Sequence, residues 1–129
     1  MLINGILNPH INSLLARVRH TNLLVIADRG FPFWPMIETV DISLVDGIPT
    51  VLQVYNAIRL NFQIQEIIMA REFLEVNPLD VCAPLTEATS KYQISFESHA
   101  DLKSRVPCAV GLIRTGDTTQ YANMILISG

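Results

Sequence analysis

Three short apolar runs constrain the fold of this chain more than any other feature of its sequence. The runs occupy residues 22–28 (NLLVIAD), 109–115 (AVGLIRT) and 123–128 (NMILIS). Because apolar side chains follow one another instead of alternating with polar ones, the runs are typical of strands covered on both faces of a sheet. Helical segments alternate with the strands, so we expect a three-layer α/β/α fold with a mostly parallel, mixed sheet. No repeat or linker divides the chain, and residues 1–129 are expected to form a single domain.

The first helix has the clearest predicted limits. Asn8 is a suitable N-cap, Pro9 suits the first helical position, and the helix is expected to end close to His20. Its apolar face, spaced at i, i+3, i+4 and i+7, consists of Ile11, Leu14, Leu15 and Val18. The remaining pattern predicts helices over 50–60, 84–92 and 98–106, and strands over 38–44 and 93–98. Residues 63–74 are predicted to begin as a strand and end as a helix, and residues 77–84 to form a loop.

The composition indicates a protein that buries surface against copies of itself. Half of the 129 residues are apolar and only 16% are charged, whereas about 25% are charged in an ordinary soluble domain. No apolar run approaches the ~18 residues of a membrane-spanning helix, and the first residues lack the pattern of a signal peptide. We therefore expect a cytoplasmic homo-oligomer with no membrane partner.

The charge and the motifs argue against several classes of function. Lysines and arginines are scattered singly along a chain of net charge -3, so nucleic acid is not an expected partner. None of the common nucleotide-binding, hydrolase or zinc-protease motifs is present. Cys82 and Cys108 lie far apart, with no histidine at metal-ligand spacing, so we expect two buried thiols and neither a metal site nor a cofactor.

Polar residues near the ends of the apolar strands are the candidates for a functional site. Asp28 directly follows a strand, where its carboxylate needs hydrogen-bond partners or water, and strand ends are where ligands bind in α/β folds. His20 stands between the first helix and that strand, and it meets Asp28 only if the helix runs back alongside the sheet. His99 and Lys103, four residues apart, share one face of a short predicted helix, either as a solvated surface pair or as part of a site.

A turn and a buried strand meet at Tyr121, Ala122 and Asn123. Turn chemistry is one explanation, since Asn suits turns and Tyr often covers a core with its hydroxyl in water. A polar ligand held at the strand end is the other explanation. The residues alone leave both open.

Four motifs, in this order along the chain, carry a resemblance to a known family. They are GILNPHINSLLARVRHTNLLVIADRGFP (5–32), DGIPTVLQV (46–54), SHADLK (98–103) and IRTGDTTQYANMIL (113–126). Over nearly its whole length the chain resembles the D-ribose pyranase and L-fucose mutarotase family. The resemblance implies a cofactor-free isomerase that interconverts ring forms or anomers of a free monosaccharide. It also implies ring-shaped homo-oligomers, commonly decamers, with sites between subunits.

The resemblance also implies roles for individual residues. By position, His20 matches the catalytic histidine, and the sugar-contacting positions match Asp28, His99, Tyr121, Ala122 and Asn123, with Lys103 as a further contact. D-ribose, converted from β-pyranose to β-furanose, is the expected substrate. The alternatives are a mutarotase for L-fucose or another sugar, and a non-catalytic monosaccharide-binding oligomer on the same fold.

One loop departs from the family pattern. The segment RGFPFWP (29–35) is bulkier than expected, and Arg29 is placed to pair with Asp28. Pro32 and Pro35 restrict its backbone. We therefore expect Trp34 to be held either at the sugar-binding cleft or at the subunit interface beside it.

Overall fold

Helices and strands alternate along most of the chain in the computed structural model, which describes residues 1–129. Their order is α1 (Pro9–Arg17), β1 (Leu23–Ala27), β2 (Glu38–Asp41), α2 (Val51–Ile58), β3 (Ile64–Ala70), α3 (Arg71–Val76), α4 (Leu79–Ala88), β4 (Gln93–Glu97), α5 (His99–Arg105), a 3-10 turn η1 (Val106–Cys108), β5 (Gly111–Arg114) and β6 (Met124–Ser128).

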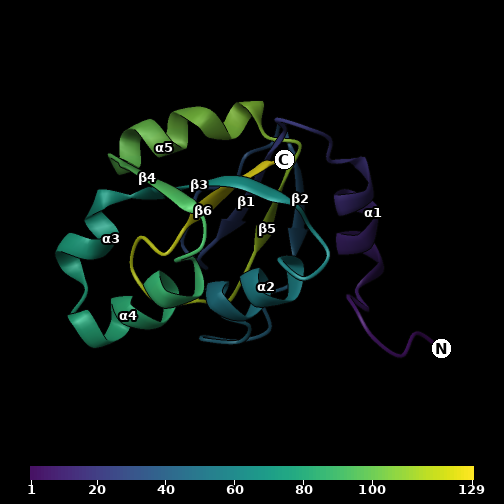
Figure 1. Cartoon of the computed structure of the whole chain (residues 1–129), viewed down its shortest axis with the longest axis horizontal. Coiled ribbons are helices and arrows are strands. Elements are labelled where there is room, and N and C mark those ends of the chain that lie inside the picture. Colours follow the sequence, from purple (N-terminus) through teal and green to yellow (C-terminus); the bar gives the residue numbers. More distant parts are fainter.

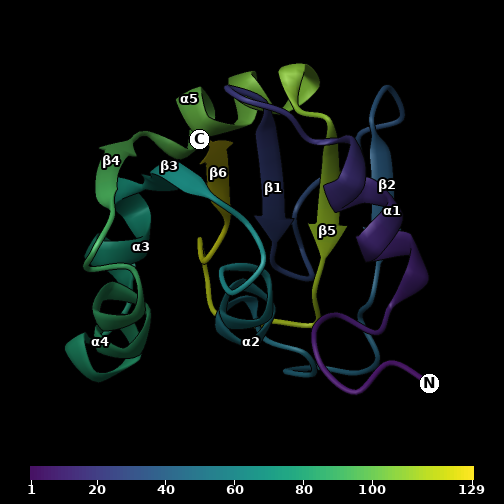
Figure 2. The ribbon, with the colours of Figure 1, turned by 45° about the vertical axis from the view of Figure 1, so that its right-hand side comes forward.

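The six strands form one sheet in the order β2-β5-β1-β6-β3-β4 (Figure 2). Strand β6 is antiparallel to both of its neighbours, β1 and β3, and every other pair is parallel. The predicted mixed, mostly parallel sheet is therefore confirmed.

Both faces of the sheet are covered, which is why the central strand β1 is apolar throughout. Along β1, Leu24 and Ile26 belong to the larger core cluster, whereas Val25 and Ala27 belong to the smaller one. Successive side chains of a strand point to opposite faces, so each cluster fills one side. Figure 1 shows α5 on one side of the sheet and α2 and α4 on the other, which makes three layers.

The first helix is capped as predicted but ends early. Asn8 Oδ1 accepts hydrogen bonds from the backbone N–H groups of His10 (2.9 Å) and Ile11 (3.1 Å). The helix stops at Arg17, because Val18 has an extended backbone. The following turn joins the helix to β1, and His20 lies exposed within that turn.

The loop predicted over 77–84 is wrong from Leu79 onwards, where α4 begins. This helix contains Pro84, which lacks an N–H, and an interior proline costs a helix about 3 kcal/mol. Cys82 and Leu85, three residues apart, both pack into the larger core cluster. Their burial favours the helix over the loop that the proline suggests.

Only one of the two predicted buried thiols is buried. Cys82 lies in the core, whereas Cys108 is exposed. In the short η1 turn the buried position is taken by Val106, and Cys108, the third residue of the turn, faces outwards.

The sheet topology brings distant segments to one edge. The parallel strands β1, β5, β3 and β4 all end there, and the antiparallel β6 begins there. Residues that follow β1 and β4 therefore lie beside residues that precede β6. Asp28, His99 and Asn123 occupy those three positions.

Candidate functional site

Asp28 and Asn123 are joined by two hydrogen bonds at this edge of the sheet. The Asp28 backbone N–H donates to Asn123 Oδ1 (2.7 Å), and Asn123 Nδ2 donates to Asp28 Oδ2 (3.1 Å). The Gly30 backbone N–H donates to the other carboxylate oxygen, Asp28 Oδ1 (2.9 Å). Asn123 uses both ends of its carboxamide on Asp28, so it positions that carboxylate and keeps one N–H for a ligand.

His99, Tyr121 and Phe31 form the aromatic side of the site. The His99 and Tyr121 ring centroids are 4.9 Å apart with the planes at 84°, and Phe31 lies 5.9 Å from His99. Tyr121 has a φ of 58°, a left-handed backbone that a non-glycine residue adopts at an energetic cost. The His99 Nε2 atom is buried and has no hydrogen-bond partner. A ligand hydroxyl at this position would remove the cost of leaving that atom unpaired.

The environment shifts the pKa of both titratable groups at the site. Burial raises the pKa of the Asp28 carboxyl above its ordinary value, against the opposing effect of the Gly30 and Asn123 hydrogen bonds. Burial, together with the nearby Lys103 ammonium, lowers the pKa of His99, although the Glu72 and Asp28 carboxylates oppose this. His99 is therefore neutral near pH 7, and its Nε2 atom can either accept or donate one hydrogen bond.

The lowered pKa of His99 makes folding sensitive to mild acid. The unfolded chain binds a proton at this position from about pH 6.5 downwards, before the folded chain does. The free energy of unfolding therefore decreases as the pH falls from about 6.5, the pKa in the unfolded chain, to the lower pKa of His99 in the folded chain. In melting experiments at fixed protein concentration, the wild type should lose stability faster below pH 6.5 than His99→Gln does. Parallel curves for the two proteins would contradict this assignment.

A cavity of about 250 Å³ joins these groups. It is lined by Asp28, Gly30, Phe31, Pro32, His99, Gln120, Tyr121 and Asn123. The structure thus brings together Asp28, His99, Tyr121 and Asn123, four of the positions that the family resemblance assigned to sugar contact. Four further lining residues were not predicted as site residues. Gly30, Phe31 and Pro32 belong to the bulky loop that follows Asp28, and Gln120 precedes Tyr121.

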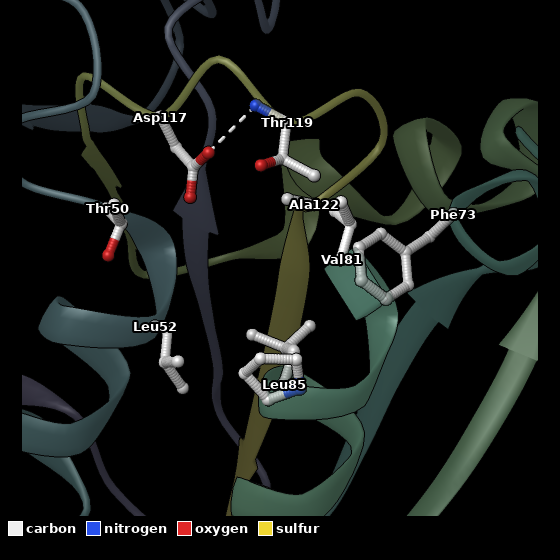
Figure 3. A pocket seen from close by; sticks show the side chains of 9 residues that line it. Thr50, Leu52, Phe73, Val81, Leu85, Asp117, Thr119 and Ala122 are labelled. Atoms are coloured by element: carbon white, nitrogen blue, oxygen red, sulfur yellow. Dashed lines mark hydrogen bonds between the residues drawn. The ribbon is translucent and has the colours of Figure 1, made fainter. Parts of the chain in front are cut away.

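Ala122 points away from its two neighbours. Its side chain lines a second cavity of about 190 Å³, between α2 and α4 (Figure 3). Asp117, only 7% exposed, lies at the rim of that cavity and accepts hydrogen bonds from the backbone N–H groups of Val51 and Thr119 (2.8 Å each). Any contact between Ala122 and a sugar in the first cavity would therefore use backbone atoms. Through these bonds Asp117, which was not predicted as a site residue, fixes the loop that carries Tyr121.

His20 lies at the opposite edge of the sheet from Asp28. It precedes β1 and Asp28 follows it, and the five residues of that strand alone separate the two edges by about 16 Å. The first helix does not close this gap. Within one chain, the predicted catalytic histidine and the predicted sugar-contacting residues are thus apart. Lys103 lies beside His99 on α5, close enough to influence its pKa.

The loop after Asp28 differs from its prediction at Arg29, whereas Trp34 lies outside the cavity and its place at a subunit interface stays a prediction. Arg29 pairs with Asp46 (2.6 Å) at the surface and not with Asp28. Trp34 is partly buried against the smaller core cluster, with its ring centroid 6.3 Å from that of Phe31. Phe31, and not Trp34, lines the cavity. Phe33 is left exposed.

The chain offers neither a metal cluster nor a membrane span. No group of three or more His, Cys, Asp or Glu side chains is arranged to hold a metal ion. None of the helices has the length and apolar character needed to cross a bilayer. The polar groups of the site are hydrogen-bonding side chains, which suit an uncharged ligand rich in hydroxyl groups.

The whole chain matches one known protein family. The model of the RbsD / FucU transport protein family matches residues 1–129. The chain belongs to this family. D-ribose pyranase from Geobacillus thermodenitrificans (strain NG80-2) is 40% identical to this RbsD / FucU chain, over 98% of the chain and 95% of that protein. D-ribose pyranase from Clostridium botulinum (strain Eklund 17B / Type B) is 36% identical, over 97% and 95%.

Solved structures of related proteins share the fold. Bacillus subtilis RbsD complexed with D-ribose has a TM-score of 0.91 and 32% identity, over 100% of this RbsD / FucU chain and 98% of that one. The fucose mutarotase from Streptococcus pneumoniae in complex with L-fucose has a TM-score of 0.78 and 18% identity, over 95% and 92%. At 18% identity, the similarity to the fucose mutarotase shows a shared fold alone.

Proposed function

We propose that this chain is a D-ribose pyranase, an isomerase that interconverts the β-pyranose and β-furanose forms of free D-ribose without a cofactor. The observation that carries the proposal is the cavity where Asp28, His99 and Tyr121 converge, in a chain up to 40% identical to D-ribose pyranases. We assign residues 1–129 to a single pyranase-like domain, since strands from both ends of the chain share one sheet.

The reaction needs proton transfer and little else. Opening the pyranose ring requires a proton on the ring oxygen and removal of one from the anomeric hydroxyl, and closing to the furanose through another hydroxyl reverses these transfers. Atoms and charge balance without an oxidant or a metal. We assign the transfer to His20, because an imidazole exchanges protons near pH 7. Asp28, His99, Tyr121 and the free N–H of Asn123 would hold the sugar hydroxyls.

The separation of His20 from the cavity supports a site shared between subunits. We propose a cytoplasmic homo-oligomer, a decamer, in which His20 of a neighbouring copy reaches the cavity. Exposed apolar side chains, among them Leu44, Val45 and Ile48, offer surface for such contacts. Lys103, beside His99, is a further candidate for a sugar contact.

A mutarotase for L-fucose or another sugar is the alternative. The observation that favours it is the apolar side of the cavity, where Phe31 would suit a methyl group. A third possibility is a monosaccharide-binding oligomer without catalysis, which would fill the cavity with a sugar but not accelerate its exchange.

Saturation-transfer NMR on free sugars separates these functions. Irradiating the β-pyranose signal of D-ribose should deplete the β-furanose signal faster when the protein is added, and L-fucose anomers should exchange more slowly under the same conditions. Faster exchange of L-fucose than of D-ribose would favour the alternative. Line broadening without faster exchange of any sugar would indicate a binding protein and refute the isomerase.

A further inference from the structure

One guanidinium holds the loop that carries half of the cavity. Arg114, the last residue of β5, donates from Nη1 to the carbonyl oxygens of Asp28 (3.3 Å) and Arg29 (3.2 Å). Its Nη2 donates to the carbonyl oxygen of Pro32 (3.1 Å). Three carbonyl groups of one short loop thus converge on a single side chain.

These carbonyl groups need a partner from outside the loop. Residues 28–32 have left the strand ladder, and Pro32 fixes the direction of the chain. A guanidinium presents five N–H donors in one plane, so it can serve several carbonyl groups at once, whereas an ammonium is a compact point charge. Arg114 makes no ion pair with a carboxylate, unlike Arg17, Arg29 and Arg105, so these carbonyl groups account for its polar contacts.

The held loop contributes directly to the cavity. Asp28, Gly30, Phe31 and Pro32 all line it. The remaining anchors of the loop act near its start: the Asp28 N–H donates to Asn123, and the Arg29 N–H donates to the carbonyl of Asp117 (3.0 Å). Of these anchors, only Arg114 spans the loop from Asp28 to Pro32.

We infer that Arg114 is a positioning residue for sugar binding, which holds residues 28–32 so that the Asp28 carboxylate and the Phe31 ring face the cavity. The inference rests on the proposed function for its substrate, D-ribose. Arg114 would act on the affinity for sugar more than on proton transfer, because it contacts neither the sugar-facing groups of α5 nor His20.

Steady-state exchange of D-ribose in Arg114→Met tests this, with Arg29→Met as a matched control. Both variants remove one arginine from the loop environment, but Arg29 pairs only with the exposed Asp46. We expect KM to rise about tenfold in Arg114→Met, as for loss of a charge-assisted hydrogen bond, with kcat changing much less. Arg29→Met should match the wild type. Arg114→Lys keeps the charge without the planar fork and should fall between them.

Two further readouts keep the inference testable if Arg114→Met folds poorly. Millimolar guanidinium, but not ammonium, should lower the raised KM of Arg114→Ala and leave the wild type unaffected. Amide hydrogen exchange at Gly30 and Phe31 should be faster in Arg114→Lys than in Arg29→Met, whether or not the wild type is active. An inactive wild type would refute the proposed function alone. A normal KM and normal loop exchange in folded Arg114 variants would overturn the role of Arg114.

Discussion

The His20→Ala variant is expected to catalyse D-ribose exchange about 10²–10⁴-fold more slowly than the wild type, because this factor is the usual contribution of a general acid–base group. Because His20 is exposed in a turn outside the core, the variant should keep its melting temperature and its oligomeric state. The measurement is saturation-transfer NMR on D-ribose, with light scattering and thermal melting as controls. Near-normal exchange in a folded His20→Ala protein would refute the catalytic assignment.

A mixing experiment asks which subunit supplies the histidine. His20 and the cavity lie at opposite edges of the sheet, so a site shared between copies should be restored when two inactive variants assemble together. His20→Ala keeps the cavity, and a cavity variant at Asp28 keeps His20. After dissociation and reassembly at equal amounts, about a quarter of the sites should be complete in a closed ring of identical contacts. No recovery in well-mixed oligomers would refute the shared site.

Asp28→Asn should lower kcat/KM for D-ribose by about 100-fold, although it exchanges only one heavy atom. In the wild type the Asp28 carboxylate accepts from both Gly30 and Asn123. An amide at position 28 places an NH₂ group against the Asn123 NH₂, and Asn123 cannot rotate without losing the Asp28 backbone N–H. An unmatched buried pair of this kind destabilises the folded state by about 3 kcal/mol. The loss of a charged acceptor for a sugar hydroxyl costs the bound state up to about 3 kcal/mol, or roughly 100-fold in kcat/KM. The same NMR assay, together with thermal melting, measures both the catalytic and the structural effect.

The exchanged double variant, Asp28→Asn with Asn123→Asp, separates these two effects. Asp at 123 can accept from the backbone N–H and from the new amide of residue 28, whose oxygen can still accept from Gly30. All three hydrogen bonds are then satisfied, with the charge moved to the neighbouring residue. We expect the melting temperature to recover while the activity stays low, because the sugar requires the carboxylate at 28. Recovered activity would mean that the network matters and the position of the charge does not.

Most of the local structure could be predicted from the sequence. The apolar runs that became β1, β5 and β6 reflect burial on both faces, and the cap at Asn8 rests on hydrogen bonds within three residues of the cap. The failures came where packing outweighed local preference. Pro84 suggested a loop, but the core contacts of its neighbours made a helix.

The site was predictable only in part. Asp28, His99, Tyr121 and Asn123 were each identified, and the family resemblance suggested that they act together. The pairing of Asp28 with Asn123, and the three carbonyl groups around Arg114, left no trace in the sequence. These contacts join residues 82 to 95 positions apart, far beyond the reach of periodicity and capping.

The sequence by itself determined most of the segments that become strands and helices, because side-chain periodicity and local hydrogen bonds act over a few residues. The tertiary structure alone decided which polar residues meet. Strand β6 runs antiparallel between β1 and β3, so the residue before it lies beside the residues that follow its parallel neighbours. His20 precedes β1 and Asp28 follows it, so the length of the strand places the two residues at opposite edges of the sheet.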